Sequence, residues 1–385
     1  MSPERKAVVD GNRLILIEEG PERLVTLLRI IAEARERLCL YYYIFAGDST
    51  GQQVRAALIE ACRRGVAVTV MVDAFGSADT GDDFFAPLVE AGARFGRFGT
   101  RRSTRYLIRN HQKMAIADGT RAVIGGFNVE DGYFAGDEDA GGWCDLALMV
   151  EGPAVTHLQH WYDGMAEWVL DGRQGFRALR RLVGRWRHGG SGAVQWLMGG
   201  PTARLNNWAR RVKADLQHGR RLDMIAAYFS PGRGMLRRMT RIAQRGEARL
   251  IVPLYSDNSM TIGAARHLYR RMLGKGVQLY EYQCGKLHMK LIVIDDIVYI
   301  GSANFDKRSL FLNVEVMLRI EDSAFAEDVR ALVVRREAES RRIDEAAYRA
   351  LSGPVARLRW LVSYLLVGVM DFTVTRRLNF RSEPR

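Results

Sequence analysis

The stretch "HMKLIVIDDIVYIGSANF" (288–305) repeats a pattern that the chain first shows in "HQKMAIADGTRAVIGGFN" (111–128). Each copy begins with a histidine, has a lysine two residues later and an aspartate five residues after that, and closes with a glycine turn and an asparagine. The residues between these polar groups are apolar and often β-branched, which is typical of buried strands. Because buried strands normally exclude ionisable groups, the two copies indicate a functional site as well as a core.

The recurrence exceeds chance. Seven histidines and seven lysines among 385 residues give about 0.13 His-x-Lys pairs by chance, and an aspartate follows at the same distance in both copies. Alternate residues of a strand face the same side. We therefore expect His111 to project beside Lys113, and His288 beside Lys290.

The sequence around each copy repeats as well. Residues 37–73 and 221–253 both show an apolar strand, a glycine-containing turn, an amphipathic helix, a glycine stop and a second strand. A further helix then leads to the His-x-Lys strand. Strands that alternate with helices of about 10–15 residues predict an α/β fold with mainly parallel sheets. We expect two similar halves packed around a pseudo-twofold axis, which would bring the two polar strands to one interface.

The predicted division of the chain follows from this repeat. A basic helix (176–188) and a Gly/Ser stretch (189–192) separate the two copies. We expect a first half over residues 1–190, a second half over 191–340 and a helical tail over 341–385.

The duplicated residues suit phosphoryl transfer through the protein. Two imidazoles, two ammonium groups and the carboxamides of Asn128 and Asn304 form a cluster of phosphate size. A neutral imidazole would attack phosphorus to give a phosphohistidine, while the other imidazole, protonated, would donate to the leaving alkoxide and later deprotonate the incoming alcohol or water. The lysines and asparagines would bind the non-bridging oxygens. This chemistry needs no metal or other cofactor, and we expect none.

Four carboxylates accompany the motifs. Asp118 and Asp295 fall on the opposite face of their strands, so we interpret them as structural groups that fix the following turns. Asp145 and Glu315 lie 34 and 27 residues after the histidines of their own halves. They are the candidates to orient the imidazoles, as carboxylates do in other His–carboxylate pairs; the alternative is that they are ordinary acids at strand ends.

The charge balance predicts an anionic partner. The chain has 57 basic and 44 acidic residues, a net charge of +13, which suits nucleic acid or an anionic membrane surface. No stretch approaches the roughly 20 apolar residues of a spanning helix. The apolar segment 359–370, flanked by arginines, is expected to be either a C-terminal core helix or an interfacial helix on anionic lipid.

With its HxKxxxxD and GSxN-type motifs in both halves, the sequence resembles the phospholipase D superfamily. The flanks "RNHQK" (109–113), "WCDLAL" (143–148) and "NFDKRSLFLNVE" (304–315) resemble the bacterial cardiolipin synthases more narrowly. The resemblance covers roughly residues 10–340. It implies the following catalytic residues: His111 as nucleophile, His288 as acid/base, and with them Lys113, Asp118, Asn128, Lys290, Asp295 and Asn304.

Two details depart from that pattern. Gly126 stands where the family often has serine, and the hairpin between Asp295 and Gly301 is one residue shorter than the corresponding hairpin of the first copy. Neither departure removes a catalytic side chain.

The resemblance implies a phosphatidyltransferase that passes a phosphatidyl group from phosphatidylglycerol, through a phosphohistidine, to the hydroxyl of a second phospholipid. The protein would then be peripheral on the cytoplasmic face of the cell membrane, or cytoplasmic if the tail is a core helix. One alternative is a hydrolytic phospholipase D that forms phosphatidic acid. A superfamily nuclease is another, against which the synthase-like flanks argue. Complete motifs in both halves argue against a non-catalytic scaffold.

Overall fold

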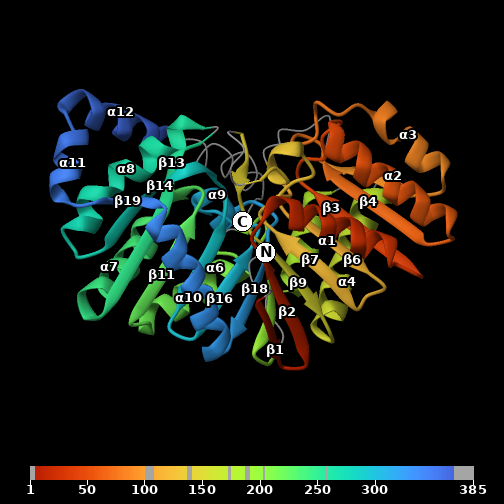
Figure 1. Ribbon diagram of the computed structural model, residues 1–385, viewed down its shortest axis with the longest axis horizontal. Coiled ribbons are helices and arrows are strands. Elements are labelled where there is room, and N and C mark those ends of the chain that lie inside the picture. Colours follow the sequence, from red (N-terminus) through yellow and green to blue (C-terminus); the bar gives the residue numbers. More distant parts are fainter. Residues whose placement is uncertain are drawn as a thin grey trace.

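The computed structural model describes residues 5–99, 108–136, 141–171, 175–186, 191–202, 204–256 and 258–367. Within that part, two α/β halves lie side by side, the first in red to yellow and the second in green to blue (Figure 1). Each half contains one large sheet with helices against it. The prediction of an α/β fold with two similar halves is confirmed.

The first sheet has the strand order β1-β2-β9-β7-β6-β3-β4-β5. Its strands are β1 (Arg5–Val9), β2 (Asn12–Ile17), β3 (Arg37–Tyr42), β4 (Ala67–Asp73), β5 (Arg94–Phe98), β6 (Met114–Ala117), β7 (Arg121–Gly125) and β9 (Ala147–Glu151). The accompanying helices are α1 (Gly20–Ala32), α2 (Ser49–Arg63), α3 (Asp82–Glu90) and α4 (Ala154–Leu170), with a short 3-10 turn, η2, at Asp131–Tyr133.

The second sheet has the order β10-β18-β16-β15-β11-β13-β14-β19. Its strands are β10 (Val194–Met198), β11 (Arg221–Ala226), β13 (Glu247–Tyr255), β14 (Gln278–Leu287), β15 (Lys290–Ile294), β16 (Ile297–Gly301), β18 (Val316–Glu321) and β19 (Ser340–Ile343). Strands β12 (Phe229–Ser230) and β17 (Phe305–Asp306) form a separate pair. The helices of the second half are α6 (Asn207–His218), α7 (Arg233–Arg245), α8 (Ser259–Leu273), α9 (Lys307–Phe311), α10 (Ser323–Ala338), α11 (Glu345–Leu351) and α12 (Pro354–Leu365). Helix α5 (Phe176–Arg185) comes before them in the chain and contacts α4 of the first half.

The prediction of mainly parallel sheets is wrong. Strands β3, β4 and β5 are parallel to one another, as are β11, β13 and β14, but the other pairs along the two strand orders given above are antiparallel. The reason lies in the motifs themselves. Each His-x-Lys strand turns back at once through a tight hairpin, β6–β7 or β15–β16, and such a short connection joins only antiparallel strands.

The two halves share a core. One cluster of buried apolar side chains crosses from the first sheet to the second and includes Ile116, Ile124, Leu148, Val293, Ile300 and Leu318. The first half also lends a strand to the second sheet, since β8 (Trp143–Cys144) pairs in parallel with β14. The interface is therefore built as a protein interior, which fixes the two motifs relative to each other.

Candidate active site

Each histidine is held by the backbone of the opposite half. The N–H of His111, just before β6, donates to the carbonyl of Val314 at 2.8 Å, and the N–H of His288, just before β15, donates to the carbonyl of Cys144 at 2.8 Å. A parallel bridge between Asn110 and Val314 completes the first contact. The inter-half pairing thus brings both motifs to one place.

The orienting carboxylates cross between the halves. The Nδ1 of His288 lies 2.7 Å from Oδ2 of Asp145, and the Nδ1 of His111 lies 3.4 Å from Oε2 of Glu315 and 3.1 Å from the carbonyl oxygen of Ser302. Each carboxylate thus lies beside the histidine of the other half, which the spacing in the sequence does not show. Asp145 and Glu315 each follow the residue whose carbonyl holds the opposite histidine, so their side chains reach across with it.

Both carboxylates are fully buried and anionic. Burial alone would raise the pKa of Asp145, but the attraction of His288 and Lys290 lowers that pKa below its usual value. Burial opposes ionisation of Glu315 too, and His111 with Lys113 lowers its pKa. A buried carboxylate in this state needs a donor, and the Nδ1–H of an imidazole provides one.

The histidines are neutral at neutral pH in the free protein. Burial, together with Lys290 and against the attraction of Asp145, lowers the pKa of His288 to about 4. Burial and Lys113 also lower the pKa of His111. With Nδ1 donating its proton to the carboxylate, each ring keeps the lone pair of Nε2 for chemistry.

The two lysines make the site a binding place for an anion. Lys113 and Lys290 are 0% and 3% exposed, and their Nζ atoms donate to the carbonyls of the histidines two residues before them. Burial and the repulsion of Lys290 lower the pKa of Lys113 well below its usual value. An anionic phosphate between the two ammonium groups would relieve that repulsion.

The asparagines differ in their contacts. The Oδ1 of Asn128 accepts from the N–H of Ile44 at 3.2 Å. The Oδ1 of Asn304 is buried and has no hydrogen-bond partner among the described residues. Buried polar atoms rarely remain unpaired, so this carbonyl oxygen is available to a hydrogen-bond donor of a ligand.

The structure does not bring the motif aspartates to this cluster. Asp118 accepts hydrogen bonds from the N–H groups of Arg35, Glu36 and Arg37. Asp295 accepts hydrogen bonds from those of Arg220 and Arg221, so each aspartate fixes the start of the neighbouring strand. Both have positive φ, 52° and 48°. Each aspartate lies at the far end of its strand from the lysine.

Aromatic rings enclose the imidazoles, which the sequence did not indicate. The ring centroid of Tyr43 lies 4.9 Å from that of His111, and the rings of Tyr133 and Trp143 each lie 5.3 Å from that of His288. The run Tyr41–Tyr43 predicts only sheet core. The backbone leaves β3 after Tyr42, and this departure turns the third ring toward the site.

The glycine–serine departure between the copies has a structural cause. A Cβ on Gly126 would lie 2.4 Å from Oδ1 of Asp145. In the second half the hydroxyl of Ser302 donates to Oε2 of Glu315 at 2.6 Å. Asp145 thus occupies space that a serine at position 126 would need.

Comparisons with known proteins agree with this architecture. The family model described as "Cardiolipin synthase, PLD-like domain" matches residues 27–165 and 213–335. A cardiolipin synthase of Geobacillus sp. is 31% identical over 78% of this chain and 61% of its own length. Cardiolipin synthase B of Escherichia coli K12 is 32% identical over 83% of this chain and 79% of its own.

The chain therefore spans about three fifths of the length of the Geobacillus relative. Among solved structures, phosphatidylserine synthase of Haemophilus influenzae superposes with a TM-score of 0.72 at 13% identity, covering 94% of both chains. At that identity the likeness concerns the fold alone. Two matched family segments, one for each half, and curated relatives above 30% identity place this chain in the cardiolipin synthase family of phospholipase D-like proteins.

Proposed function

We propose that the protein is a phosphatidyltransferase of the cardiolipin synthase type. It would take a phosphatidyl group from phosphatidylglycerol and pass it to the hydroxyl of a second phosphatidylglycerol, releasing glycerol. The observation that carries this proposal is the composite site: two neutral histidines, each hydrogen-bonded to a buried carboxylate of the opposite half, beside two buried lysines.

The first step would be attack of the Nε2 of His111 on the phosphorus of the lipid. The P–O bond to the glycerol headgroup breaks, and the Nε2–H of protonated His288 donates its proton to the leaving oxygen. The bound phosphodiester favours that protonation because its negative charge opposes the repulsion from Lys290 and Lys113 that lowers the pKa of His288. Asp145 stabilises the resulting imidazolium through the 2.7 Å contact.

The second step would reverse these roles. The neutral Nε2 of His288 deprotonates the hydroxyl of the second lipid, whose oxygen attacks phosphorus and releases His111. Lys113 and Lys290 would hold the non-bridging oxygens in both steps, and the NH2 group of Asn304 would be a further donor to them. Water in place of the lipid hydroxyl would give phosphatidic acid, so the enclosing aromatic rings would favour transfer by limiting water.

Helix α12 supports a peripheral position on a membrane. No helix among the described residues is long and apolar enough to cross a bilayer. Trp360 and Ser363 of α12 are buried, whereas its outer side exposes Val355 (81%), Leu358 (63%) and Val362 (45%). The helix therefore has one side in the core, as expected of a core helix, and one exposed apolar side, as expected of an interfacial helix. The exposed side would enter the lipid interface. Residues 368–385, with Arg376 and Arg377, lie outside the described residues.

The test is product analysis. Purified protein is incubated in EDTA with vesicles of labelled phosphatidylglycerol, and the lipids are resolved. We expect cardiolipin and free glycerol from the wild-type protein. Phosphatidic acid without cardiolipin would replace the transferase by a hydrolase, and an absence of lipid turnover would contradict the proposed function.

A further inference from the structure

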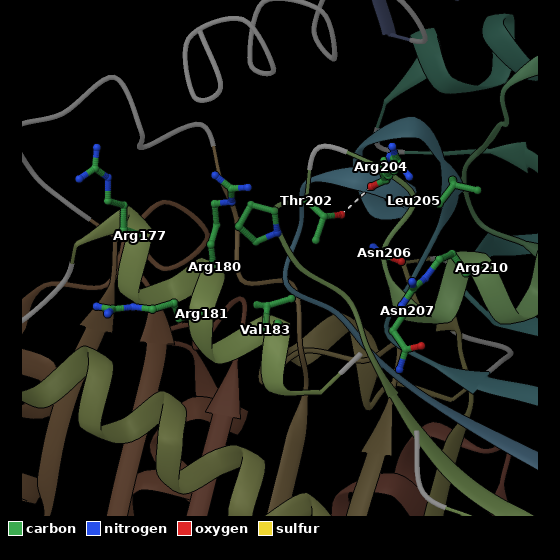
Figure 2. Close-up of a pocket in the computed structure, with 12 residues that line it drawn as sticks. Arg177, Arg180, Arg181, Val183, Thr202, Arg204, Leu205, Asn206, Asn207 and Arg210 are labelled. Carbon is green, nitrogen blue, oxygen red and sulfur yellow. Dashed lines mark hydrogen bonds between the residues drawn. The ribbon is translucent and has the colours of Figure 1, made fainter. Parts of the chain in front are cut away.

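A large basic cavity lies beside the first histidine's network. It has a volume of about 930 Å³ and is lined by residues of α5, of the segment after β10 and of α6. Figure 2 shows Arg180 on one wall and Arg204 on the other, both extending toward the same upper side of the cavity. Its lining includes neither of the two histidines nor either motif lysine.

The charge of this cavity is one-sided. Five arginines line it, and no aspartate or glutamate is among the described lining residues: Arg177, Arg180, Arg181, Arg204 and Arg210. Three of them lie on α5, where Arg177 is three residues before Arg180 and four residues before Arg181, and like charges at these spacings destabilise a helix. Guanidinium groups bind phosphate oxygens in pairs of parallel hydrogen bonds. The cavity is therefore suited to phosphate.

The cavity is also connected to the catalytic network. The Nδ2 of Asn206, in its wall, donates to the carbonyl of Ser309 at 2.8 Å, and the hydroxyl of Ser309 donates to Oε1 of Glu315 at 2.8 Å. Glu315 is the carboxylate beside His111. A ligand in the cavity would lie close to the site without occupying it.

We propose that this arginine cavity binds the phosphate groups of anionic phospholipid headgroups at the membrane surface, as a second lipid site that is separate from the two-histidine centre. The inference rests on the proposed function in one respect, since it places the protein on an anionic bilayer. Lipid is favoured over nucleic acid because α12 exposes an apolar face, which a bilayer covers and a nucleic acid does not.

The experiment measures binding without turnover. The full chain carrying His111→Ala is mixed with phosphatidylcholine vesicles that contain or lack phosphatidylglycerol, and bound protein is measured by sedimentation. Removal of one guanidinium near an anionic surface weakens binding about fivefold. We expect Arg180→Gln with Arg204→Gln to weaken binding to the anionic vesicles about 25-fold.

A matched control removes the same charge elsewhere. Arg237 and Arg241 are exposed on α7 and do not line the cavity. Arg237→Gln with Arg241→Gln is expected to change vesicle binding less than about threefold. Equal losses in both double variants would show that net charge alone governs binding and would overturn the proposal. Thermal melting of each variant establishes that it is folded.

Two further probes separate the sources of phosphate. Inorganic phosphate and a DNA duplex are titrated at matched ionic strength. If the Arg180/Arg204 variant loses affinity for either probe but binds anionic vesicles as before, the proposal is wrong. Because His111→Ala removes turnover, vesicle binding is measured independently of activity. If vesicle binding depends on Arg180 and Arg204 but the wild-type protein forms no cardiolipin, only the proposed function is contradicted. If the wild-type protein forms cardiolipin but the Arg180/Arg204 variant binds anionic vesicles as before, only this inference is contradicted.

Discussion

The two copies of the motif differ most in how their carboxylates are held. Asp145 contacts His288 at 2.7 Å and also accepts a hydrogen bond from the N–H of Leu146. Glu315 lies 3.4 Å from His111 and is shared among neutral donors: the hydroxyls of Ser302 and Ser309 at 2.6 and 2.8 Å and the amide of Asn313 at 3.4 Å.

This difference suits different chemical roles. The short contact with Asp145 favours a histidine that must carry a proton, because a carboxylate with a close contact to the ring and few other donors stabilises the imidazolium. Glu315 spreads its charge over several donors, so it orients His111 while attracting its proton less. The asymmetry therefore supports His288 as the acid/base and His111 as the nucleophile, and substitutions in the two networks test it.

Loss of either histidine is expected to have the largest effect. His111→Ala and His288→Ala should each lower cardiolipin formation by about 10⁴-fold or more, because each removes a group that bonds or transfers a proton at the reacting centre. Samples denatured with SDS at mildly alkaline pH, where the P–N bond of a phosphohistidine survives, should contain a phosphatidyl-protein adduct in the wild-type protein and none in the His111 variant. An adduct that persists without His111 would reverse the assignment.

The loss of activity on replacing each carboxylate is expected to follow the length of its contact with the histidine, with the shorter contact giving the larger loss. Asp145→Asn should lower kcat by about 10²-fold, since the amide supports neither the tautomer nor the charge of His288. Glu315→Gln should cost about tenfold, because Ser302 and Ser309 still hold the side chain. Steady-state rates with phosphatidylglycerol vesicles measure both. A larger loss for Glu315→Gln would show that the shorter contact is not the more important one.

Substitutions at Gly126 and Ser302 are expected to have smaller effects on the rate, and one adds a hydroxyl group where the other removes one. Gly126→Ser copies the residue of the second half, but its Cβ would displace the carboxylate of Asp145 and should lower kcat about tenfold. Ser302→Ala removes one of several donors to Glu315 and should cost about threefold. Rates equal to wild type for Gly126→Ser would mean that the backbone moves to accommodate the serine, contrary to the packing described here.

The smallest expected effect concerns stability against pH. The folded-state pKa of His288 is lowered to about 4 from the ordinary 6.5, so between these values the unfolded chain binds a proton that the folded chain does not. The contribution of neutral His288 to the free energy of unfolding is therefore fully present above about pH 6.5 and is lost as pH falls toward about 4. Denaturation midpoints of wild type and His288→Gln should converge over that range. Parallel curves would contradict the low pKa.

Local sequence pattern was enough to single out the residues of the candidate site but not their arrangement. The strand period placed His111 with Lys113 and His288 with Lys290, and the repeat predicted a shared interface. Nothing in the spacing of Asp145 and Glu315 shows that they cross between halves, because that follows from the backbone pairing of Cys144 and Val314 with distant residues. Secondary-structure patterns do not specify which distant strands pair.

Local sequence pattern also did not predict the direction of the strands, the position of the third tyrosine or the arginine cavity. The helix–strand alternation correctly predicted the parallel strands β3–β5, yet each motif hairpin added antiparallel strands whose apolar runs look the same in sequence. The third tyrosine of the run and the arginine cavity depend on turns that join segments far apart in the chain, such as α5 and the segment before α6.

The crossed pairing is tested most directly by proton NMR of the imidazole Nδ1–H groups, assigned with His111→Gln and His288→Gln. The account predicts that Asp145→Asn shifts or removes the strongly downfield Nδ1–H signal of His288 and leaves that of His111 in place, while Glu315→Gln does the reverse. A response of His111 to Asp145→Asn, with His288 unchanged, would contradict it.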